Sequence, residues 1–205
     1  MRILWGRPNS VNVKKALWAL DELGVPYERR DAGMQYGVVN TPEYRAKNPM
    51  GLVPTLEEDG FVLWESHTIV RYLAAKHGTG TLCPADVRAR ADAERWMDWA
   101  FTFQAAMRNV FWGLIRTPPE KRDAGAIEEG RRRSAELLAI PEKILAGRAY
   151  LCGERFTMGD IPLGCEVQRW MRVPIERPSF PHVEAWFDRL REREPFRRWV
   201  DVPLT

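Results

Sequence analysis

The sequence lacks the features that mark exported, membrane-spanning or zinc-stabilised proteins. Its three cysteines, Cys83, Cys152 and Cys165, are widely spaced and form no CxxC motif, which argues against a disulfide framework and a structural zinc site. No stretch approaches the roughly 18 apolar residues of a spanning helix, and the N-terminal segment lacks the apolar core of a signal peptide. We therefore expect a soluble, cytoplasmic protein with reduced thiols and no membrane partner.

A strong charge imbalance is also absent. The 205 residues include 31 basic and 28 acidic side chains, and the net charge of +3 gives no case for a nucleic-acid partner. The three histidines, His67, His77 and His182, have no mutual spacing that indicates a metal site, and no glycine-rich phosphate loop occurs. With 45% hydrophobic residues, the chain can form one large domain or two small ones.

The first third of the chain alternates strand and helix signals. A β-rich run at 2–6 precedes a helix that Ser10 opens and Gly24 closes, and a second strand candidate follows. Thr41 and the proline after it predict a short helix, and two β-rich runs joined by Asp-Gly at 59–60 predict an antiparallel hairpin. With a closing helix from His67 to His77, the predicted order is βαβ, a helical connection, then ββα.

No convincing strand occurs in the rest of the chain. We predict an N-terminal domain over residues 1–78, a linker over 79–86 and an all-helical C-terminal domain over 87–205. Helical patterns cover 87–112 and about 119–146, a third begins at Thr157, and a last one, near 182–192, precedes a tail. The third is marked by a capping-box pattern from Thr157 to Asp160, which is a structural signal.

Three short segments suit a ligand. Val53 precedes a proline and is biased toward extended geometry, which leaves its backbone edge available. Glu65 and Ser66 fall at a strand-to-helix turn, where free backbone N–H groups attract anions. Ser10 lies where a first helix begins, and on local sequence its simplest role is that of an N-cap.

These segments carry a family resemblance. RPNSVNVKKALWALDELGVPYE, TPEYRAKNPMGLVPTL and FVLWESHTIVRYL, in this order and spacing, resemble the thioredoxin-like domain of the cytosolic glutathione transferase superfamily. The nearest members are bacterial, theta-like and serine-type, and the later FTMGDI is similar to the family's N-capping box. The resemblance covers essentially the whole chain. It implies an α/β thioredoxin-like domain followed by an all-α domain.

The resemblance also implies an activity. The chain is expected to be a glutathione S-transferase that joins the glutathione thiolate to small apolar electrophiles, with glutathione as co-substrate and no further cofactor. Serine-type relatives are commonly homodimers, and we expect a two-fold dimer here. Two alternatives remain open: a glutathione-dependent isomerase or peroxidase that uses the same thiolate, and a non-catalytic binding module that kept the fold.

Six positions match the family's site. Ser10 falls on the catalytic serine that stabilises the thiolate, and Asn12 is a candidate for a second donor to the sulfur. By the same resemblance, Val53 is expected to pair its backbone with the cysteinyl part of glutathione, and Pro54 is expected to be the family's cis-proline. The resemblance further implies that Glu65 accepts the γ-glutamyl ammonium and that Ser66, with the helix N-terminus, binds the α-carboxylate.

Some positions depart from the family pattern. Relatives place a cation or an amide near the glycyl carboxylate at two positions that hold Val39 and Leu52 here, and neither can bind a carboxylate by its side chain. Asn40, Arg45 and Lys47 are candidate substitutes. Separately, Glu94 lies near where relatives offer a carboxylate across a dimer interface, although a surface helix carries many such residues.

The electrophile pocket is expected between the domains. An aromatic and methionine stripe on the first long C-terminal helix suits flat apolar electrophiles, although most such stripes are core. The candidates are Phe103, Met107, Val110, Phe111 and Trp112.

Overall fold

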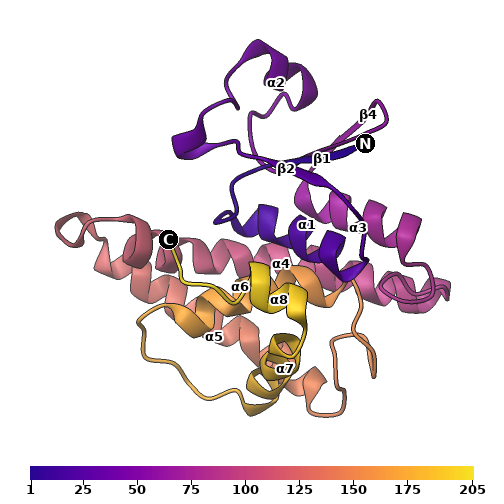
Figure 1. Ribbon diagram of the computed structural model, residues 1–205. Helices are drawn as coiled ribbons and strands as arrows, with labels where there is room; N and C mark the ends of the chain where they lie inside the picture. Colours follow the sequence, from indigo (N-terminus) through magenta and orange to yellow (C-terminus); the bar gives the residue numbers. More distant parts are fainter.

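The computed structural model describes all of residues 1–205 and begins with a four-stranded mixed sheet. The strands β1 (Arg2–Trp5), β2 (Glu28–Arg30), β3 (Thr55–Glu58) and β4 (Phe61–Trp64) lie in the order β2-β1-β3-β4. β1 is parallel to β2 and antiparallel to β3, which in turn is antiparallel to β4. Helices α1 (Val11–Glu22) and α3 (Ser66–His77) lie between this sheet and the C-terminal helices, and α2 (Pro42–Lys47) lies beyond the sheet (Figure 1). The predicted thioredoxin-like βαβ-ββα order is confirmed.

Local signals in the sequence account for these elements. The Thr41 hydroxyl accepts a hydrogen bond from the Tyr44 amide at 3.3 Å and caps α2. Asp59 and Gly60 have φ values of 50° and 86°, the left-handed pair that a two-residue hairpin turn requires between β3 and β4. Gly24, with φ of 62°, follows the end of α1.

The C-terminal part contains helices only. They are α4 (Val87–Phe111), α5 (Ala124–Leu145), α6 (Asp160–Arg172), α7 (Pro181–Arg191) and α8 (Glu194–Trp199), with a π-helical turn at Trp112–Arg116 after α4. Short 3₁₀ turns occur at Met34–Tyr36 and Pro119–Lys121. No helix combines the length and the apolar character needed to span a bilayer.

Three boundaries differ from the sequence predictions. Residues expected to form a tail contain α8, because the buried Phe196 ring packs on Trp18 of α1 with 4.8 Å between ring centroids. The predicted capping box is present, since the Thr157 hydroxyl accepts the Gly159 amide at 3.3 Å and the Asp160 carboxylate accepts the Thr157 amide at 2.9 Å, but α6 begins only at Asp160, after this turn. α5 begins at Ala124 and not near 119, because Asp123 caps it.

Helix α1 is held by both halves of the chain. Its Trp18 is fully buried and stacks on Phe156, with 5.3 Å between centroids, in a core that continues into the C-terminal helices. Gly164 of α6 permits this approach, since a Cβ there would lie 3.1 Å from the Trp18 ring. Ion pairs from Arg193 to Glu22 and from Arg198 to Asp21 fix its C-terminal end. These contacts pack α1 on α6 and α8, while its first turn meets α4 through the hydrogen bond between Gln104 and Asn12.

Candidate active site

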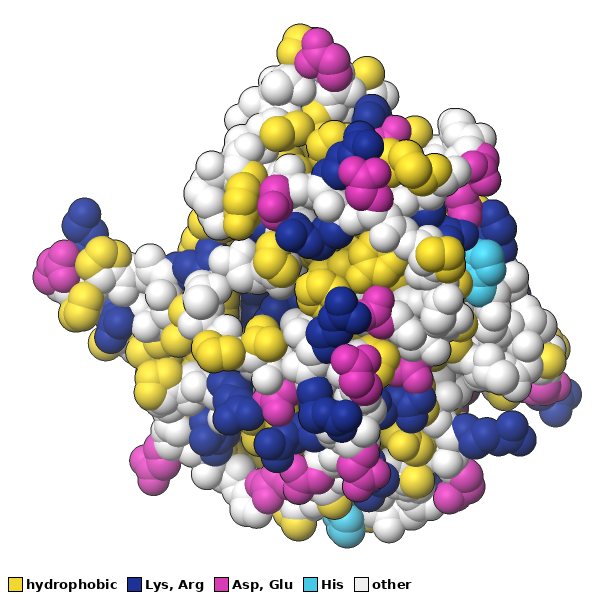
Figure 2. All heavy atoms as spheres, viewed as in Figure 1, with side chains coloured by type: hydrophobic (Ala, Val, Ile, Leu, Met, Phe, Trp, Pro, Cys, Tyr) yellow, Lys and Arg dark blue, Asp and Glu magenta, His cyan; other side chains and the backbone are white.

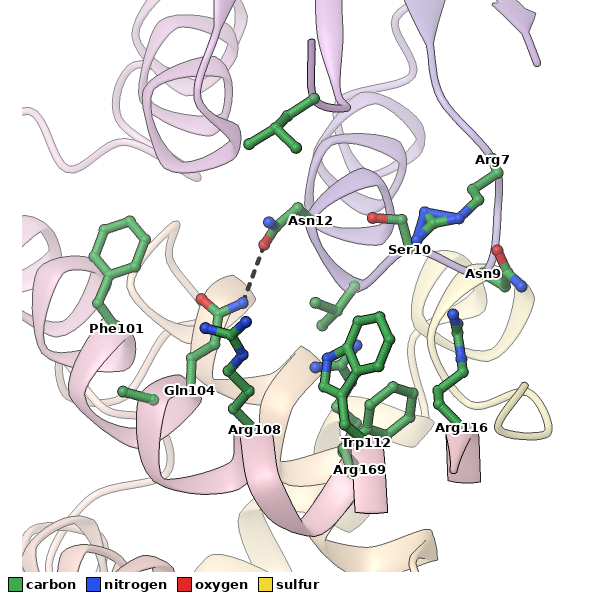
Figure 3. A pocket seen from close by; sticks show the side chains of 14 residues that line it. Arg7, Asn9, Ser10, Asn12, Phe101, Gln104, Arg108, Trp112, Arg116 and Arg169 are labelled. Carbon is green, nitrogen blue, oxygen red and sulfur yellow. Dashed lines mark hydrogen bonds between the residues drawn. The ribbon is translucent and has the colours of Figure 1, made fainter. Parts of the chain in front are cut away.

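A cavity lies between the N-terminus of α1 and helix α4. It has a volume of about 660 Å³ and is lined by 14 residues from both halves of the chain. Ser10 and Asn12 approach it from the start of α1, and Phe101, Gln104 and Arg108 approach it from α4 (Figure 3). Two of the six residues predicted for the site therefore meet the helical domain in one cavity.

The sheet register brings the other four residues to the same end of the sheet. Thr55 pairs with Trp5 at the end of β1 and with Trp64 at the end of β4. The chain before Thr55, which holds Val53 and Pro54, therefore lies beside the start of α1 and the start of α3. Val53, Pro54, Glu65 and Ser66 are outside the cavity lining, which includes the neighbouring Leu52, and these four residues are called the ledge below.

Ser10 occupies the N-cap position of α1 without capping it. Its side chain accepts no hydrogen bond from the first helical turn, although it is only 8% exposed. The first intrahelical bond runs from the Lys14 amide to the Ser10 carbonyl, so the amides of residues 11–13 have no backbone acceptor. A nearly buried hydroxyl and the positive end of a helix are thus both available to an anion in the cavity.

Two hydrogen bonds to Asn12 Oδ1 fix the orientation of the Asn12 side chain. The Lys15 ammonium donates to Asn12 Oδ1 at 3.1 Å, and Gln104 Nε2 donates to the same oxygen at 3.3 Å (Figure 3). Because an ammonium group can only donate, the oxygen must face Lys15 and the Nδ2 hydrogens remain free. Asn12 is therefore oriented as a donor toward the cavity.

Behind Asn12 is a buried charge cluster that joins the two domains. Lys15 of α1, His67 of α3 and Glu166 of α6 are each at most 1% exposed. Lys15 Nζ lies 3.1 Å from His67 Nε2 and 3.7 Å from Glu166 Oε1. No group of three or more His, Cys, Asp or Glu side chains is placed to hold a metal ion.

Burial controls the charges in this cluster. It lowers the pKa of Lys15, which the Glu166 carboxylate opposes. Burial, and then the charge of Lys15, lower the pKa of His67 to about 2, so the imidazole is neutral at physiological pH. Its ring stacks on Phe101, a cavity residue, with 3.9 Å between centroids.

The loop that holds Val53 is anchored through its neighbour. The Leu52 carbonyl accepts hydrogen bonds from Tyr44 Oη at 2.8 Å and from Asn48 Nδ2 at 2.9 Å. Neither backbone polar group of Val53 bonds to another backbone group, which leaves its edge free. The Val53–Pro54 peptide bond is cis, as the sequence resemblance predicted.

The turn at Glu65 and Ser66 has an unusual backbone. Glu65 has φ of 71°, which is uncommon for a residue with a side chain and is typical of functional turns. Ser66 is 4% exposed and is the first residue of α3, where backbone N–H groups are unpaired. The Glu65 side chain, which caps nothing, is exposed at this helix start.

The residues considered for the glycyl end are partly engaged elsewhere. Lys47 pairs with Glu57 at 2.7 Å and lies over the Trp5 ring, away from the cavity. Arg45 donates to Asn40 Oδ1 at 3.0 Å and to the Pro49 carbonyl at 2.9 Å, so these two remain as an exposed pair. Leu52 is 58% exposed and lines the cavity.

Three of the predicted pocket residues are wrong. Phe103, Met107 and Val110 are fully buried in the core and do not line the cavity, whereas Phe111 and Trp112 do. Both sets lie on one amphipathic helix, and the sequence period does not tell which face meets solvent. Sequence reasoning also missed four arginines of the cavity, Arg7, Arg108, Arg116 and Arg169, because they come from separate segments.

Comparisons with known proteins agree with this architecture. Family models described as the glutathione S-transferase N-terminal and C-terminal domains match residues 4–81 and 103–194. Glutathione S-transferase GstB of Escherichia coli is 40% identical, with all of both chains covered, and glutathione S-transferase 3 of Zea mays is 31% identical over 98% of this chain and 94% of its own. A theta class glutathione S-transferase from Xanthomonas axonopodis pv. citri, solved with glutathione bound, is 48% identical with a TM-score of 0.96, over 100% of this chain and 99% of its own. The chain belongs to the glutathione S-transferase family.

Proposed function

We propose that Ser10, with the first turn of α1 and the amide of Asn12, holds the thiolate of bound glutathione for attack on an electrophile. The observation that carries this proposal is a serine at an N-cap position whose hydroxyl caps nothing and faces a cavity. A serine used only as a cap would bond to an amide of the first turn. The free hydroxyl supports a role toward a ligand instead.

The chemistry requires a lowered thiol pKa. A free thiol has a pKa near about 8.5 and is mostly protonated at neutral pH. Hydrogen bonds from Ser10 and Asn12 and the positive end of α1 favour the thiolate over the thiol. The thiolate then forms a C–S bond to the electrophilic carbon, while the bond to the leaving group breaks and that group departs with the electron pair.

The rest of glutathione lies along the ledge beside the cavity. The free backbone edge of Val53, next to the cis Pro54, pairs with the cysteinyl unit. The unpaired amides at Ser66 bind the γ-glutamyl carboxylate, and the exposed Glu65 accepts its ammonium. Glutathione is the only co-substrate that this arrangement calls for, with no resident cofactor.

The electrophile occupies the cavity between the domains. Phe101, Phe111 and Trp112 provide apolar walls for a small molecule beside Ser10.

We propose a cytoplasmic homodimer as the working form. Glu94 is paired with Arg90 at 2.9 Å within its own chain, which argues against a charge offered freely to the site of a second protomer.

Calorimetric titration with glutathione tests this function. We expect one binding site per chain with an affinity in the range from micromolar to millimolar. The Ser66→Pro variant removes an amide from the ledge and is expected to weaken binding, while Ser134→Ala, at a buried serine on α5 outside the cavity, serves as the control. Absence of binding at millimolar glutathione would favour a non-catalytic module that kept the fold.

A further inference from the structure

The charged side chains that line the cavity are all of one sign. Four arginines, Arg7, Arg108, Arg116 and Arg169, are among its 14 lining residues, and no aspartate or glutamate is. On the face shown in Figure 2, by contrast, acidic and basic side chains are mixed over the helical domain. The cavity is therefore electropositive in a protein of net charge +3.

Two of these arginines are fixed by protein partners. Arg169 lies 3.3 Å from the buried Glu166 carboxylate and stacks on the Phe111 ring at 3.9 Å. Arg116 donates from Nε to the Thr205 backbone oxygen at 2.8 Å and lies over the Phe111 and Trp112 rings. These contacts orient both guanidinium groups at one end of the cavity.

The other two arginines have no acceptor. The Nε atom of Arg7 is buried and has no hydrogen-bond partner. Neither Arg7 nor Arg108 donates to another lining side chain; the Arg7 guanidinium lies beside Ser10, and the Arg108 guanidinium lies beside Gln104 on the α4 side of the same cavity (Figure 3). A buried donor without a partner costs free energy until a ligand supplies the acceptor.

Electrostatic repulsion among the arginines also favours the binding of an anion. Burial, and then the charges of Arg116 and Arg169, lower the pKa of Arg7, and burial followed by Arg169 lowers that of Arg116. An anion among these groups relieves both the desolvation and the repulsion, and guanidinium groups match a carboxylate in a two-point geometry.

We propose that the second substrate is an aromatic or similarly flat electrophile that carries a carboxylate, bound by Arg7 and Arg108 within the cavity. This inference rests on the proposed function, because it assigns the molecule that the thiolate attacks. The Phe101 and Trp112 side chains, 45% and 46% exposed, provide faces for its ring. It narrows the apolar electrophile expected from the sequence to one with an anionic end.

The test compares two probes that differ by one charge. They are a chlorodinitrobenzoate, with chlorine para to the carboxylate, and the matching carboxamide. In each, the glutathione sulfur bonds to the chlorine-bearing carbon, chloride leaves with the electron pair, and the thiol proton passes to solvent. Each kcat/KM is divided by the uncatalysed rate constant with glutathione at the same pH. We expect the normalised value to favour the benzoate by about tenfold or more.

Three variants assign the preference. Arg108→Gln and Arg7→Gln are each expected to reduce the ratio of benzoate to carboxamide by about tenfold. Arg108 is exposed on α4, so this variant is expected to fold even if the Arg7 variant does not. Arg88→Gln is the matched control, since Arg88 is an exposed arginine of the same helix outside the cavity and its loss changes the net charge equally.

Several results would overturn the proposal. An equal loss for both probes would mean that the arginines act on the thiolate. A rise in KM for glutathione alone would assign them to its glycyl carboxylate. Conjugation of both probes without preference would also reject the anion site while leaving the transferase function intact. If neither probe is conjugated, the proposed function fails, and calorimetric titration with dinitrobenzoate and dinitrobenzamide still decides whether the cavity prefers the anion.

Discussion

The Ser10→Ala substitution separates the two roles that a serine at the start of a helix can have. Replacing a serine that caps a helix by alanine usually costs about 1 kcal/mol of stability. In a chain of this size, that loss lowers the melting temperature by about 2–4 °C. Ser10 makes no capping bond, so we expect Ser10→Ala to leave the melting temperature within about 1 °C of the parent.

Activity is expected to respond very differently. A hydrogen bond to a charged group contributes about 1.5–3 kcal/mol, which corresponds to a loss of about 10- to 150-fold in turnover below the thiol pKa. The assay is kcat with a chlorodinitrobenzene at neutral pH, together with ultraviolet titration of the bound thiolate. The pKa of the bound thiol should rise by about one to two units in the variant, while glutathione affinity at low pH changes little.

The control is an N-cap residue whose side chain does cap its helix. Asp86 accepts hydrogen bonds from the amides of Arg88 and Ala89 at 3.0 and 2.9 Å at the start of α4. Asp86→Ala should lower stability by about 1 kcal/mol and leave kcat unchanged. If Ser10→Ala instead behaves in the same way as Asp86→Ala, with lost stability and full turnover, Ser10 is only a helix cap and has no role at the thiolate.

Three further predictions concern the ledge and the core. Leu52→Lys should lower KM for glutathione about two- to fivefold by pairing with the glycyl carboxylate; the same gain with glutathione esterified at glycine would contradict this. Asp160 is fully buried, and its two carboxylate oxygens accept hydrogen bonds from the amides of Leu151 and Thr157 and from Trp186 Nε1. An asparagine side chain has only one accepting oxygen, so it leaves at least one of these buried donors without a partner. Asp160→Asn should therefore reduce the free energy of unfolding in urea by about 2–3 kcal/mol, and a change below 0.5 kcal/mol, as is usual at an exposed site, would refute it. Because burial and Lys15 lower the pKa of His67 from 6.5 to about 2, only the unfolded state takes up this proton on acidification. The stability that depends on a neutral His67 is therefore fully present above pH 6.5 and is lost progressively as the pH falls from 6.5 toward about 2. The melting temperature of His67→Gln should depend less on pH in this range than that of the parent, and an equal pH dependence in both proteins would contradict the low pKa of His67.

The sequence predicted those parts of the fold that depend on local signals. The Asp59-Gly60 turn, the Thr41 cap and the α1 periodicity each lie within a few residues, and each is found in the structure. Helix α8 was missed because six residues are too few to show a period, and it is held by the contact of Phe196 with Trp18.

The cavity was less predictable because it depends on long-range packing. Arg7 and Arg169 come from a loop before α1 and from α6, and no sequence spacing connects them. On α4, the residues at 101, 104, 105 and 108 face the cavity while 103, 107 and 110 face the core. The polar residues Gln104 and Arg108 follow Phe101 at helical spacing, and this pattern in the sequence could have identified the solvent-facing side of α4.

The crystal structure of the protein with glutathione bound tests the central claim most directly. We expect the sulfur within hydrogen-bonding distance of Ser10 Oγ and Asn12 Nδ2, the cysteinyl backbone paired with Val53, and the γ-glutamyl end at Glu65 and Ser66. A sulfur directed away from Ser10, or a glutathione bound elsewhere than along this ledge, would contradict the account.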